Sequence, residues 1–311
     1  MLIDDLHSAL PDLEIKERQP LAPLCSLHVG GGAEFFVAPD SIEDMKSLLA
    51  FVVKEKIPFY VLGGGTNVLF PDGLVKGFVI STANLNSIEW RTNLTADIDA
   101  GFKIPVLMKE LHEKNLAGME FMTGIPGTLG GALNGNAGAG VHGVCELIDQ
   151  VLCVEADGEL KLWNSNEIDF GYRKCSLADG KRIIVSARMT FRKATPKDKD
   201  VLESYLLRRG SQPHGLHNAG CTFKNPDGNS AGKLLDEAGC KNLSYGGAVV
   251  SDVHANFILN KGNATADDII KLIEICAERV YENSGIKLEP EIKIFAPYAG
   301  GDDQHNFTCS D

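Results

Sequence analysis

The sequence predicts an α+β protein of three domains. Its 311 residues are too many for one typical compact domain, since a length of about 150 residues per domain indicates two or three. The pattern of apolar residues also changes near residue 80 and again near residue 200. Hydrophobic residues make up 44% and charged residues 23% of the chain, close to the average of soluble globular proteins, which favours packed domains over disorder.

Residues 1–80 are expected to form the first domain. Ser41 is a predicted N-cap, followed by Glu43 and Asp44 in the first turn of an amphipathic helix. The strand-like run "FYVLG" and a glycine-rich turn come next. The segments "GGGAEFFVAP" and "GLVKGFVIS" add one strand on each side. This order is typical of an α/β unit.

Residues 81–200 are expected to form the second domain, an antiparallel sheet with helices. Short alternating runs predict strands, and "PVLMKELHEKNL" predicts one helix between them. The turn "ADGE" at residues 156–159 joins two alternating runs, which is a signal for a β-hairpin.

Residues 201–298 are expected to form a third domain of the α/β type. A helix ends near "LLRRG", and a Pro/Gly/His-rich loop follows it. Two further helices are predicted to end at Gly239 and Gly285, with the strands "AVVS" and "NFILNKG" between them and "EIKIF" after them. Residues 299–311 have no apolar period and are expected to be disordered.

Charge and cysteine content argue against several kinds of partner. The formal net charge is −12 and no long basic run occurs, so neither nucleic acid nor an anionic membrane is an expected partner. The acidic N-terminus does not resemble a signal peptide, and no stretch approaches the roughly 18 apolar residues of a membrane span. The eight cysteines form no CxxC pair and the histidines show no ligand spacing, so we expect reduced thiols, no metal and a cytoplasmic location.

Two glycine-rich stretches, residues 62–70 and 124–140, are candidates for a nucleotide site. Glycine lets successive backbone N–H groups approach a phosphate, because no Cβ atom stands in the way. Neither stretch matches a P-loop or a Rossmann fingerprint, and each alone is explained equally well as a tight turn. Together they favour a dinucleotide site. The candidate residues are Gly63, Gly64, Gly65, Thr66, Asn67, Gly127, Thr128, Gly130 and Gly131.

Other candidate residues are ambiguous when judged from the sequence alone. Arg173 in "FGYRKC" could bind a carboxylate, although its spacing fits an ordinary surface arginine better. Glu289 and Glu291 share one face of a strand, for which solvation is a sufficient explanation. Cys221 in "NAGCTFKNP" fits a packing role better than a reactive one, although Arg208 and Arg209 lie upstream.

Eight ordered blocks of sequence carry a resemblance to a known family. They are "SLHVGGGAEFFVAP", "VLGGGTNVLF", "GIPGTLGGALNGNAGA", "FGYRKC", "NAGCTFKNP", "AGKLLDEAG", "GGAVVSDVHANFILNKGNATADDI" and "LEPEIKIF". Over about residues 20–296 they closely resemble UDP-N-acetylenolpyruvoylglucosamine reductase, a flavoenzyme of peptidoglycan precursor synthesis. The resemblance implies an FAD-binding cradle of the vanillyl-alcohol-oxidase type, closed by a substrate-binding domain. Non-covalent FAD would lie against loops 63–67 and 127–131.

The resemblance also implies a reaction and roles for its residues. NADPH would reduce the flavin, and the flavin would then reduce UDP-N-acetylglucosamine enolpyruvate to UDP-N-acetylmuramate. Arg173 would polarise the substrate carboxylate with help from Glu291. Cys221 would donate a proton where most members have serine, and a thiol of pKa about 8.5 releases a proton more readily than a hydroxyl does.

Substrate contacts and subtype follow from the same resemblance. Asn225 matches a substrate-contacting position, and Arg208, Arg209 and Gln212 match a loop expected at the diphosphate or uridine end. The short separation of Arg173 and Cys221 resembles the subtype without an inserted tyrosine loop. A monomer is expected.

Two other functions compete with this one. One is an oxidase of the same cradle superfamily acting on a hydroxy acid or sugar, against which the third-domain blocks argue. The other is an inactive nucleotide-binding regulator, against which the intact Arg173 and Glu291 argue.

Overall fold

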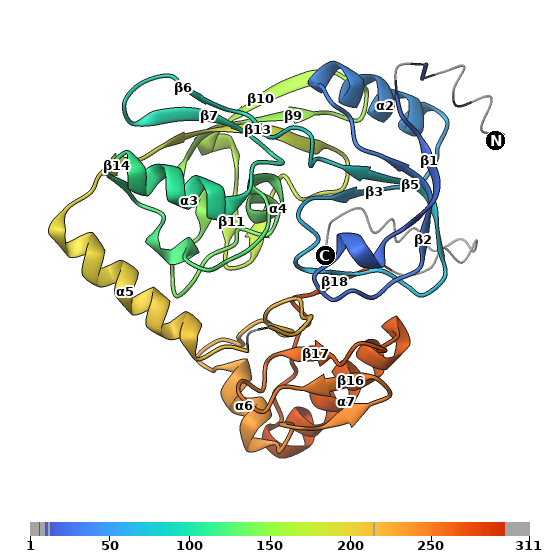
Figure 1. Cartoon of the computed structure of the whole chain (residues 1–311), viewed down its shortest axis with the longest axis vertical. Helices are drawn as coiled ribbons and strands as arrows, with labels where there is room; N and C mark the ends of the chain where they lie inside the picture. Colours follow the sequence, from blue (N-terminus) through green and yellow to red (C-terminus); the bar gives the residue numbers. More distant parts are fainter. Residues whose placement is uncertain (1–5, 7–9, 12, 214, 296–311) are drawn as a thin grey trace.

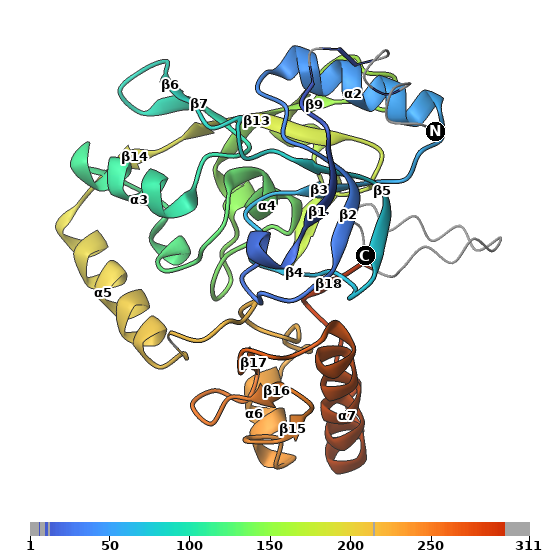
Figure 2. The same cartoon turned by 45° about the vertical axis from the view of Figure 1, so that its right-hand side comes forward.

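The computed structural model describes residues 6, 10, 11, 13–213 and 215–295. The tail for which disorder was expected therefore lies outside the described residues. The described part is a mixed α+β structure in which two sheets lie side by side and a smaller helical and stranded unit lies below them (Figures 1 and 2).

The first sheet has four strands in the order β1 (Lys16–Pro20), β2 (Gly32–Val37), β5 (Leu74–Ser81), β3 (Phe59–Leu62). β1 pairs with β2 in antiparallel fashion, whereas the other two pairs are parallel. Helix α2 (Ile42–Lys54) begins after Ser41, whose Oγ accepts from the Asp44 N–H at 3.1 Å. The predicted cap and strands are confirmed, while β1 was not predicted.

The second sheet is entirely antiparallel, as expected. Its order is β10 (Leu160–Asn164), β9 (Ile148–Val154), β13 (Ile183–Thr190), β7 (Thr95–Asp99), β6 (Ile88–Trp90). The hairpin predicted at residues 156–159 joins β9 to β10. The apolar side chains of this sheet form one core with helices α3 (Ile104–Glu113) and α4 (Leu129–Asn134). Helix α4 was not predicted.

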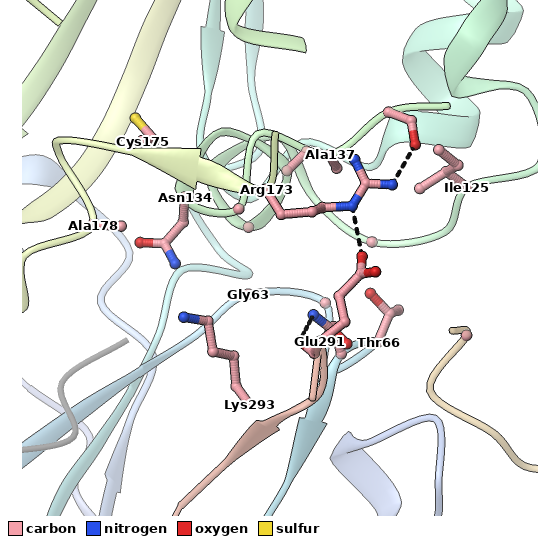
Figure 3. A pocket seen from close by; sticks show the side chains of 18 of the residues that line it. Gly63, Thr66, Ile125, Asn134, Ala137, Arg173, Cys175, Ala178, Glu291 and Lys293 are labelled. Carbon is pink, nitrogen blue, oxygen red and sulfur yellow. Dashed lines mark hydrogen bonds and ion pairs between the residues drawn. The ribbon is translucent and has the colours of Figure 1, made fainter. Parts of the chain in front are cut away.

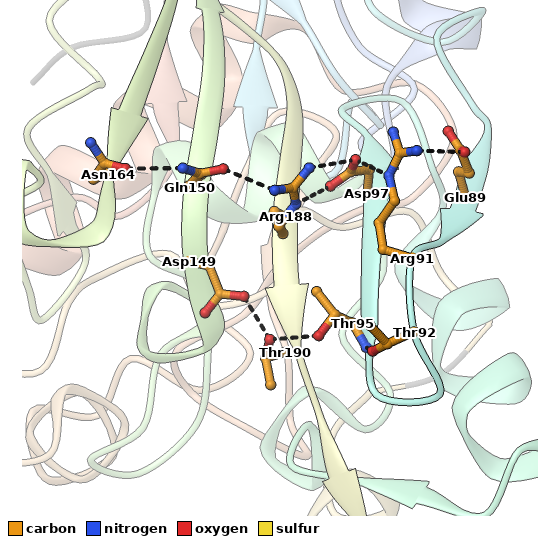
Figure 4. A network of polar contacts seen from close by, with 10 residues as sticks. All are labelled: Glu89, Arg91, Thr92, Thr95, Asp97, Asp149, Gln150, Asn164, Arg188 and Thr190. Atoms are coloured by element: carbon orange, nitrogen blue, oxygen red, sulfur yellow. Dashed lines mark hydrogen bonds and ion pairs between the residues drawn. The ribbon is translucent and has the colours of Figure 1, made fainter.

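Polar side chains cover the other face of this sheet (Figure 4). Arg188 on β13 donates from Nε and Nη2 to the two carboxylate oxygens of Asp97 on β7, at 2.7 and 2.9 Å. Arg91 donates to the same carboxylate at 2.6 Å. Alternate residues of a strand point to opposite faces, so buried Ala187 and Met189 flank Arg188 along the chain.

Several short elements lie between the longer strands and helices. The 3-10 helices are η1 (Ala22–Leu24), η2 (Glu120–Met122), η3 (Val144–Leu147) and η4 (Ser165–Glu167). The two-residue strands β8 (Leu116–Ala117) and β14 (Arg192–Lys193) pair with each other. A small hairpin, β11 (Phe170–Gly171) and β12 (Lys174–Cys175), carries Arg173 in its turn.

Helix α5 (Pro196–Gly210) connects the second sheet to the last unit (Figure 1). That unit contains helices α6 (Ala231–Glu237) and α7 (Ala266–Ser284) and an antiparallel sheet of β15 (Ser244–Tyr245), β16 (Ala248–Val250) and β17 (Ile258–Asn260). The predicted helix ends are confirmed, and Gly285 has the left-handed φ of 71° that favours glycine. The boundary proposed near residue 200 falls inside α5.

The final strand returns to the first half of the chain. β18 (Lys293–Ile294) pairs in parallel with β4 (Val68–Leu69), which directly follows the first glycine-rich turn. Phe295 then stacks on Phe70, with ring centroids 4.7 Å apart. The strand itself was predicted, and its partner was not.

Among the described residues, no helix combines the length and the apolar composition needed to span a membrane.

Candidate active site

A cavity of about 1060 Å³ lies where the two sheets meet the last unit. Both glycine-rich stretches, the β11–β12 hairpin, the C-terminal end of α5 and the segments around Cys221 and Glu291 line it. Figure 3 shows Arg173 and Glu291 pointing toward each other across it. The fold thus brings together residues that are more than a hundred positions apart in the sequence.

The two glycine-rich stretches touch each other in the wall of this cavity. A Cβ atom on Gly64 would lie 2.7 Å from the Cα atom of Gly127, closer than real Cβ contacts. Gly65 has a φ of +64°, and a Cβ atom there would lie 1.9 Å from the Leu24 carbonyl oxygen. The packing of the protein's own backbone therefore requires glycine at these two positions.

The wall also offers polar groups that suit a bound dinucleotide such as FAD. The hydroxyls of Thr82 and Thr128 are buried and have no hydrogen-bond partner within the described part of the chain. Buried hydroxyls of this kind are normally satisfied, so a ligand fits here. The Leu129 and Gly130 N–H groups instead donate to the carbonyls of Phe102 and Ala100, so they are not free for a phosphate.

Arg173 occupies the turn of the β11–β12 hairpin with a left-handed φ of 56°. Its Nε donates to Glu291 Oε1 at 2.7 Å, and its Nη2 donates to the Gly138 carbonyl at 2.8 Å (Figure 3). The side chains of Arg173 and Glu291 are only 19% and 17% exposed. The alternative of an ordinary surface arginine is therefore wrong.

Cys221 and Glu291 lie on adjacent segments that pair with each other. The Glu291 N–H donates to the Thr222 carbonyl at 2.7 Å, and the Lys224 N–H donates to the Glu289 carbonyl at 2.9 Å. Cys221 lines the cavity directly before this pairing. Lys224 also forms an ion pair with Glu289, so the two glutamates have different partners.

Removal from solvent raises the pKa values of two candidate catalytic residues, Cys221 and Glu291. It raises the pKa of Cys221 to about 11, an effect that Glu291 increases and Arg173, Arg208 and Arg209 oppose. The expectation of an ordinary thiol pKa of about 8.5 is therefore wrong, because the half-buried thiol is partly removed from solvent. Burial also raises the pKa of Glu291 despite the opposing charge of Arg173. Both changes favour protonated groups.

Asn67 links the first glycine-rich turn to Glu291. Its Nδ2 donates to the Glu291 carbonyl at 3.0 Å, and its own carbonyl accepts from the Lys293 N–H at 3.0 Å. The first glycine-rich turn and the segment that carries Glu291 are thus bonded to each other. This contact was not predicted, because it joins a side-chain amide to a backbone carbonyl far away in the chain.

The remaining candidate residues divide between two cavities. Arg208, Arg209 and Gln212 line the large cavity, where Arg209 lies against Gly124 and hydrogen bonds to Gln212. Asn225 instead lines an adjoining cavity of about 460 Å³ together with Tyr172, whose hydroxyl accepts from the Asn225 N–H at 3.2 Å. Tyr172 was not among the predicted site residues.

Comparison with known proteins defines the class of this site. Residues 33–162 match the family described as "FAD binding domain", which is the part of the chain that holds both glycine-rich stretches. Residues 212–295 match the C-terminal domain of UDP-N-acetylenolpyruvoylglucosamine reductase. With the cradle described above, these matches define an FAD-dependent oxidoreductase.

Full-length relatives narrow the class to one family. UDP-N-acetylenolpyruvoylglucosamine reductase of Geobacter metallireducens is 41% identical over 286 residues, covering 90% of this chain and 94% of the relative. The enzyme of that name from Clostridioides difficile is 37% identical, covering 93% and 96%. The crystal structure of UDP-N-acetylenolpyruvylglucosamine reductase (MurB) from Thermus caldophilus superposes with a TM-score of 0.78 at 31% identity, covering 91% of this chain and 99% of that one.

The chain therefore belongs to the UDP-N-acetylenolpyruvoylglucosamine reductase family. The predicted fold class, an α+β protein with a vanillyl-alcohol-oxidase type FAD cradle and a further C-terminal domain, is confirmed.

Proposed function

We propose that this protein reduces UDP-N-acetylglucosamine enolpyruvate to UDP-N-acetylmuramate with NADPH, a step of peptidoglycan precursor synthesis. One observation carries the proposal. The Arg173–Glu291 pair and Cys221 line the same cavity as the two touching glycine-rich stretches. Groups suited to a carboxylate and to proton transfer thus share one cavity with a site suited to FAD.

Loops 63–67 and 127–131 would hold FAD without a covalent bond. Bound FAD would supply the hydride chemistry, accepting a hydride from NADPH and passing it to the methylene carbon of the enolpyruvyl ether. The buried hydroxyls of Thr82 and Thr128 are suited to donate hydrogen bonds to it.

Arg173 would bind the substrate carboxylate, toward which negative charge moves as the hydride arrives. Its guanidinium is held by Glu291 and by the Gly138 carbonyl, so it is oriented before substrate enters. A donor fixed in advance stabilises developing charge without reorganisation. Glu291, whose pKa burial raises, would donate a hydrogen bond in its protonated form.

Cys221 would deliver the proton to the carbon next to the carboxylate. A proton donor must carry its proton when the reaction begins, and the raised thiol pKa of about 11 keeps Cys221 protonated at neutral pH. The thiolate left behind would face the guanidinium groups of Arg173, Arg208 and Arg209, which lower the pKa of Cys221.

The nucleotide end of the substrate would lie toward Arg208, Arg209, Gln212 and Asn225. Asn225 already uses its Oδ1 to accept from the Ala231 N–H at 2.9 Å, so its Nδ2 would serve the substrate. The protein would act as a monomer in the cytoplasm, with its three parts near residues 1–80, 81–200 and 201–298.

Product analysis tests the proposal. Purified protein is incubated with NADPH and the enolpyruvyl substrate, and the products are identified by mass spectrometry. We expect one UDP-N-acetylmuramate for each NADPH oxidised, with Arg173→Ala as the inactive control. NADPH oxidation that proceeds at the same rate without the enolpyruvyl substrate would contradict the proposal.

A further inference from the structure

Asn136 is a buried polar residue in the second glycine-rich stretch that the proposed mechanism does not use. The residue is 5% exposed, and its backbone has a left-handed φ of 41°. Asparagine is one of the few residues that adopt this conformation readily. A buried amide needs partners for its oxygen and its nitrogen.

The Asn136 amide joins three segments of the chain. Its Nδ2 donates to the Gly171 carbonyl at 2.8 Å, and its Oδ1 accepts from the Cys145 N–H at 3.0 Å. Gly171 lies on β11, two residues before Arg173, and Cys145 lies on η3. A Cβ atom on Gly143 would lie 2.3 Å from Oδ1, so glycine there leaves room for the amide.

The Asn136 backbone also holds the guanidinium of Arg173. Arg173 Nη1 donates to the Asn136 carbonyl at 3.4 Å, and Nη2 donates to the Gly138 carbonyl at 2.8 Å in the same loop. The amide of Asn136 therefore fixes the hairpin from which Arg173 projects, while its carbonyl contacts the end of the Arg173 side chain. One residue thus bonds both the hairpin that carries Arg173 and the guanidinium at the end of its side chain.

We infer that Asn136 is a positioning residue for Arg173, holding its guanidinium where the substrate carboxylate binds. The inference rests on the proposed function of Arg173. Loss of the amide would free the turn at Arg173, whose left-handed φ of 56° is held by its surroundings. A displacement of about 1 Å in a positioned group is sufficient to slow a reaction by about 10²-fold.

The test compares Asn136→Gly with Asn260→Ala. Glycine keeps the left-handed backbone at 136 while removing the amide. Asn260 is an equally buried asparagine whose Nδ2 donates to the Leu27 carbonyl at 2.9 Å, away from Arg173. In anaerobic stopped-flow experiments we expect Asn136→Gly to be reduced by NADPH at the wild-type rate but reoxidised by the enolpyruvyl substrate about 10²-fold more slowly. Asn260→Ala should show wild-type rates of both flavin reduction and flavin reoxidation.

Two further readouts separate positioning from general stability. Amide hydrogen exchange of residues 170–175 should accelerate in Asn136→Gly, and not in Asn260→Ala. In an Arg173→Lys background, Asn136→Gly should slow reoxidation only a little further, because both changes act on the same guanidinium position.

A second variant is available if Asn136→Gly does not fold. Asn136→Asp keeps the side-chain size and one acceptor but loses the donor to the Gly171 carbonyl, and it is measured in the same way.

Reoxidation of the folded variant at the wild-type rate would overturn the inference. A wild-type protein that NADPH does not reduce, or that the enolpyruvyl substrate does not reoxidise, would overturn the proposed function instead. The two failures are therefore distinguishable.

Discussion

Burial and nearby cations act in opposite directions on Cys221. Burial raises the pKa of the thiol to about 11, and three arginines lower it. A thiol in this state holds its proton at neutral pH, and its anion has cations around it once the proton has left. The position therefore suits a proton donor better than a nucleophile, because a nucleophilic cysteine needs a lowered pKa.

Substitution of Cys221 should affect only one half of the reaction. Cys221→Ala should leave flavin reduction by NADPH intact and slow reoxidation by the enolpyruvyl substrate by about 10²-fold or more, as expected for loss of a general acid. Cys221→Ser, which restores a proton donor of similar size, should retain much of the activity. Stopped-flow traces in which the alanine variant reoxidises normally would exclude the proton-donor role.

Alkylation should report the different acidities of two thiols in the cavity. Interaction with the neighbouring Cys145 thiol lowers the pKa of Cys175 below the ordinary thiol value. With iodoacetamide at neutral pH, Cys175 should react first. Below the pKa of Cys221, its labelling rate should increase about tenfold for each unit by which the pH is raised, because only the thiolate reacts. Bound enolpyruvyl substrate should slow the labelling of Cys221.

Peptide mass spectrometry measures the labelling rates of Cys175 and Cys221. The labelling of Cys221 is also followed in the Cys175→Ser variant, in which the faster-reacting thiol is absent. A labelling rate of Cys221 that stays constant between neutral and mildly alkaline pH would contradict the raised pKa.

Among single residues, the sequence predicts those that belong to recognisable motifs. Arg173, Cys221 and Glu291 were found through their blocks of sequence, and the structure places all three at one cavity. Asn67 and Asn136 were not given these roles, because their amides bond backbone groups of distant segments. No local pattern encodes such partners.

At the scale of elements, the contact between the two glycine-rich stretches shapes the wall of the cavity where we propose that FAD binds. Gly64→Ala should push the stretch away from Gly127, since the new Cβ atom would lie 2.7 Å from the Gly127 Cα atom. Overpacking of this kind costs about 1–3 kcal/mol. If that energy is lost from cofactor binding, the FAD affinity falls by about tenfold or more.

Gly73→Ala is the matched control, because nothing lies within 4 Å of a Cβ atom at that position. Equilibrium titration of apoprotein with FAD gives both dissociation constants. Equal affinities of Gly64→Ala and wild type would show that the stretches do not form the FAD site.

The polar face of the second sheet should contribute a pH-dependent stability. Hydrogen bonds from Arg188, followed by those from Arg91, lower the pKa of Asp97. A carboxyl with a lowered folded-state pKa stabilises the fold above its unfolded pKa of about 3.9, and this contribution is lost as the pH falls through the folded-state pKa. Asp97→Asn should therefore lower the free energy of unfolding at neutral pH, with little effect in acid.

Partial exposure limits the size of this effect. Asp97 and Arg188 side chains are 24% and 40% exposed, so we expect about 1 kcal/mol at neutral pH. Urea unfolding of both proteins between neutral and acidic pH measures the difference. Glu43→Gln, which breaks an exposed i,i+3 ion pair with Lys46, is the control. It should change the free energy of unfolding very little. A difference for Asp97→Asn that does not change with pH would contradict the prediction.

The elements that the sequence predicted have strong local signals. Helix α2 has its Ser41 cap, and α7 ends at a glycine. Strand β1, with the sequence "KERQP", is mostly exposed and has no apolar alternation, so it carries no such signal. Helix α4, "LGGALN", contains two glycines and is held by burial of Leu129 and Leu133 in the core rather than by helix propensity.

At the scale of the whole molecule, the C-terminal segment returns to the first glycine-rich turn and lines the cavity together with it. β18 pairs with β4, and Asn67 bonds the Glu291 carbonyl, so the C-terminal segment that carries Glu291 is attached to the first glycine-rich turn. The sequence predicted both segments and could not predict their pairing, since two-residue strands offer no register signal. Only tertiary structure brings Glu291 beside the first glycine-rich turn.

We propose that one cavity serves both halves of a flavin-dependent reduction. The most direct test is to reduce the purified protein with NADPH under anaerobic conditions, remove the nicotinamide, and add UDP-N-acetylglucosamine enolpyruvate while the flavin absorbance is recorded. We predict that the absorbance is lost with NADPH and returns with one equivalent of the enolpyruvyl substrate, which is converted to UDP-N-acetylmuramate. Reduced protein that stays bleached with this substrate and recovers its absorbance only when dioxygen is admitted would contradict a reductase role for this cavity.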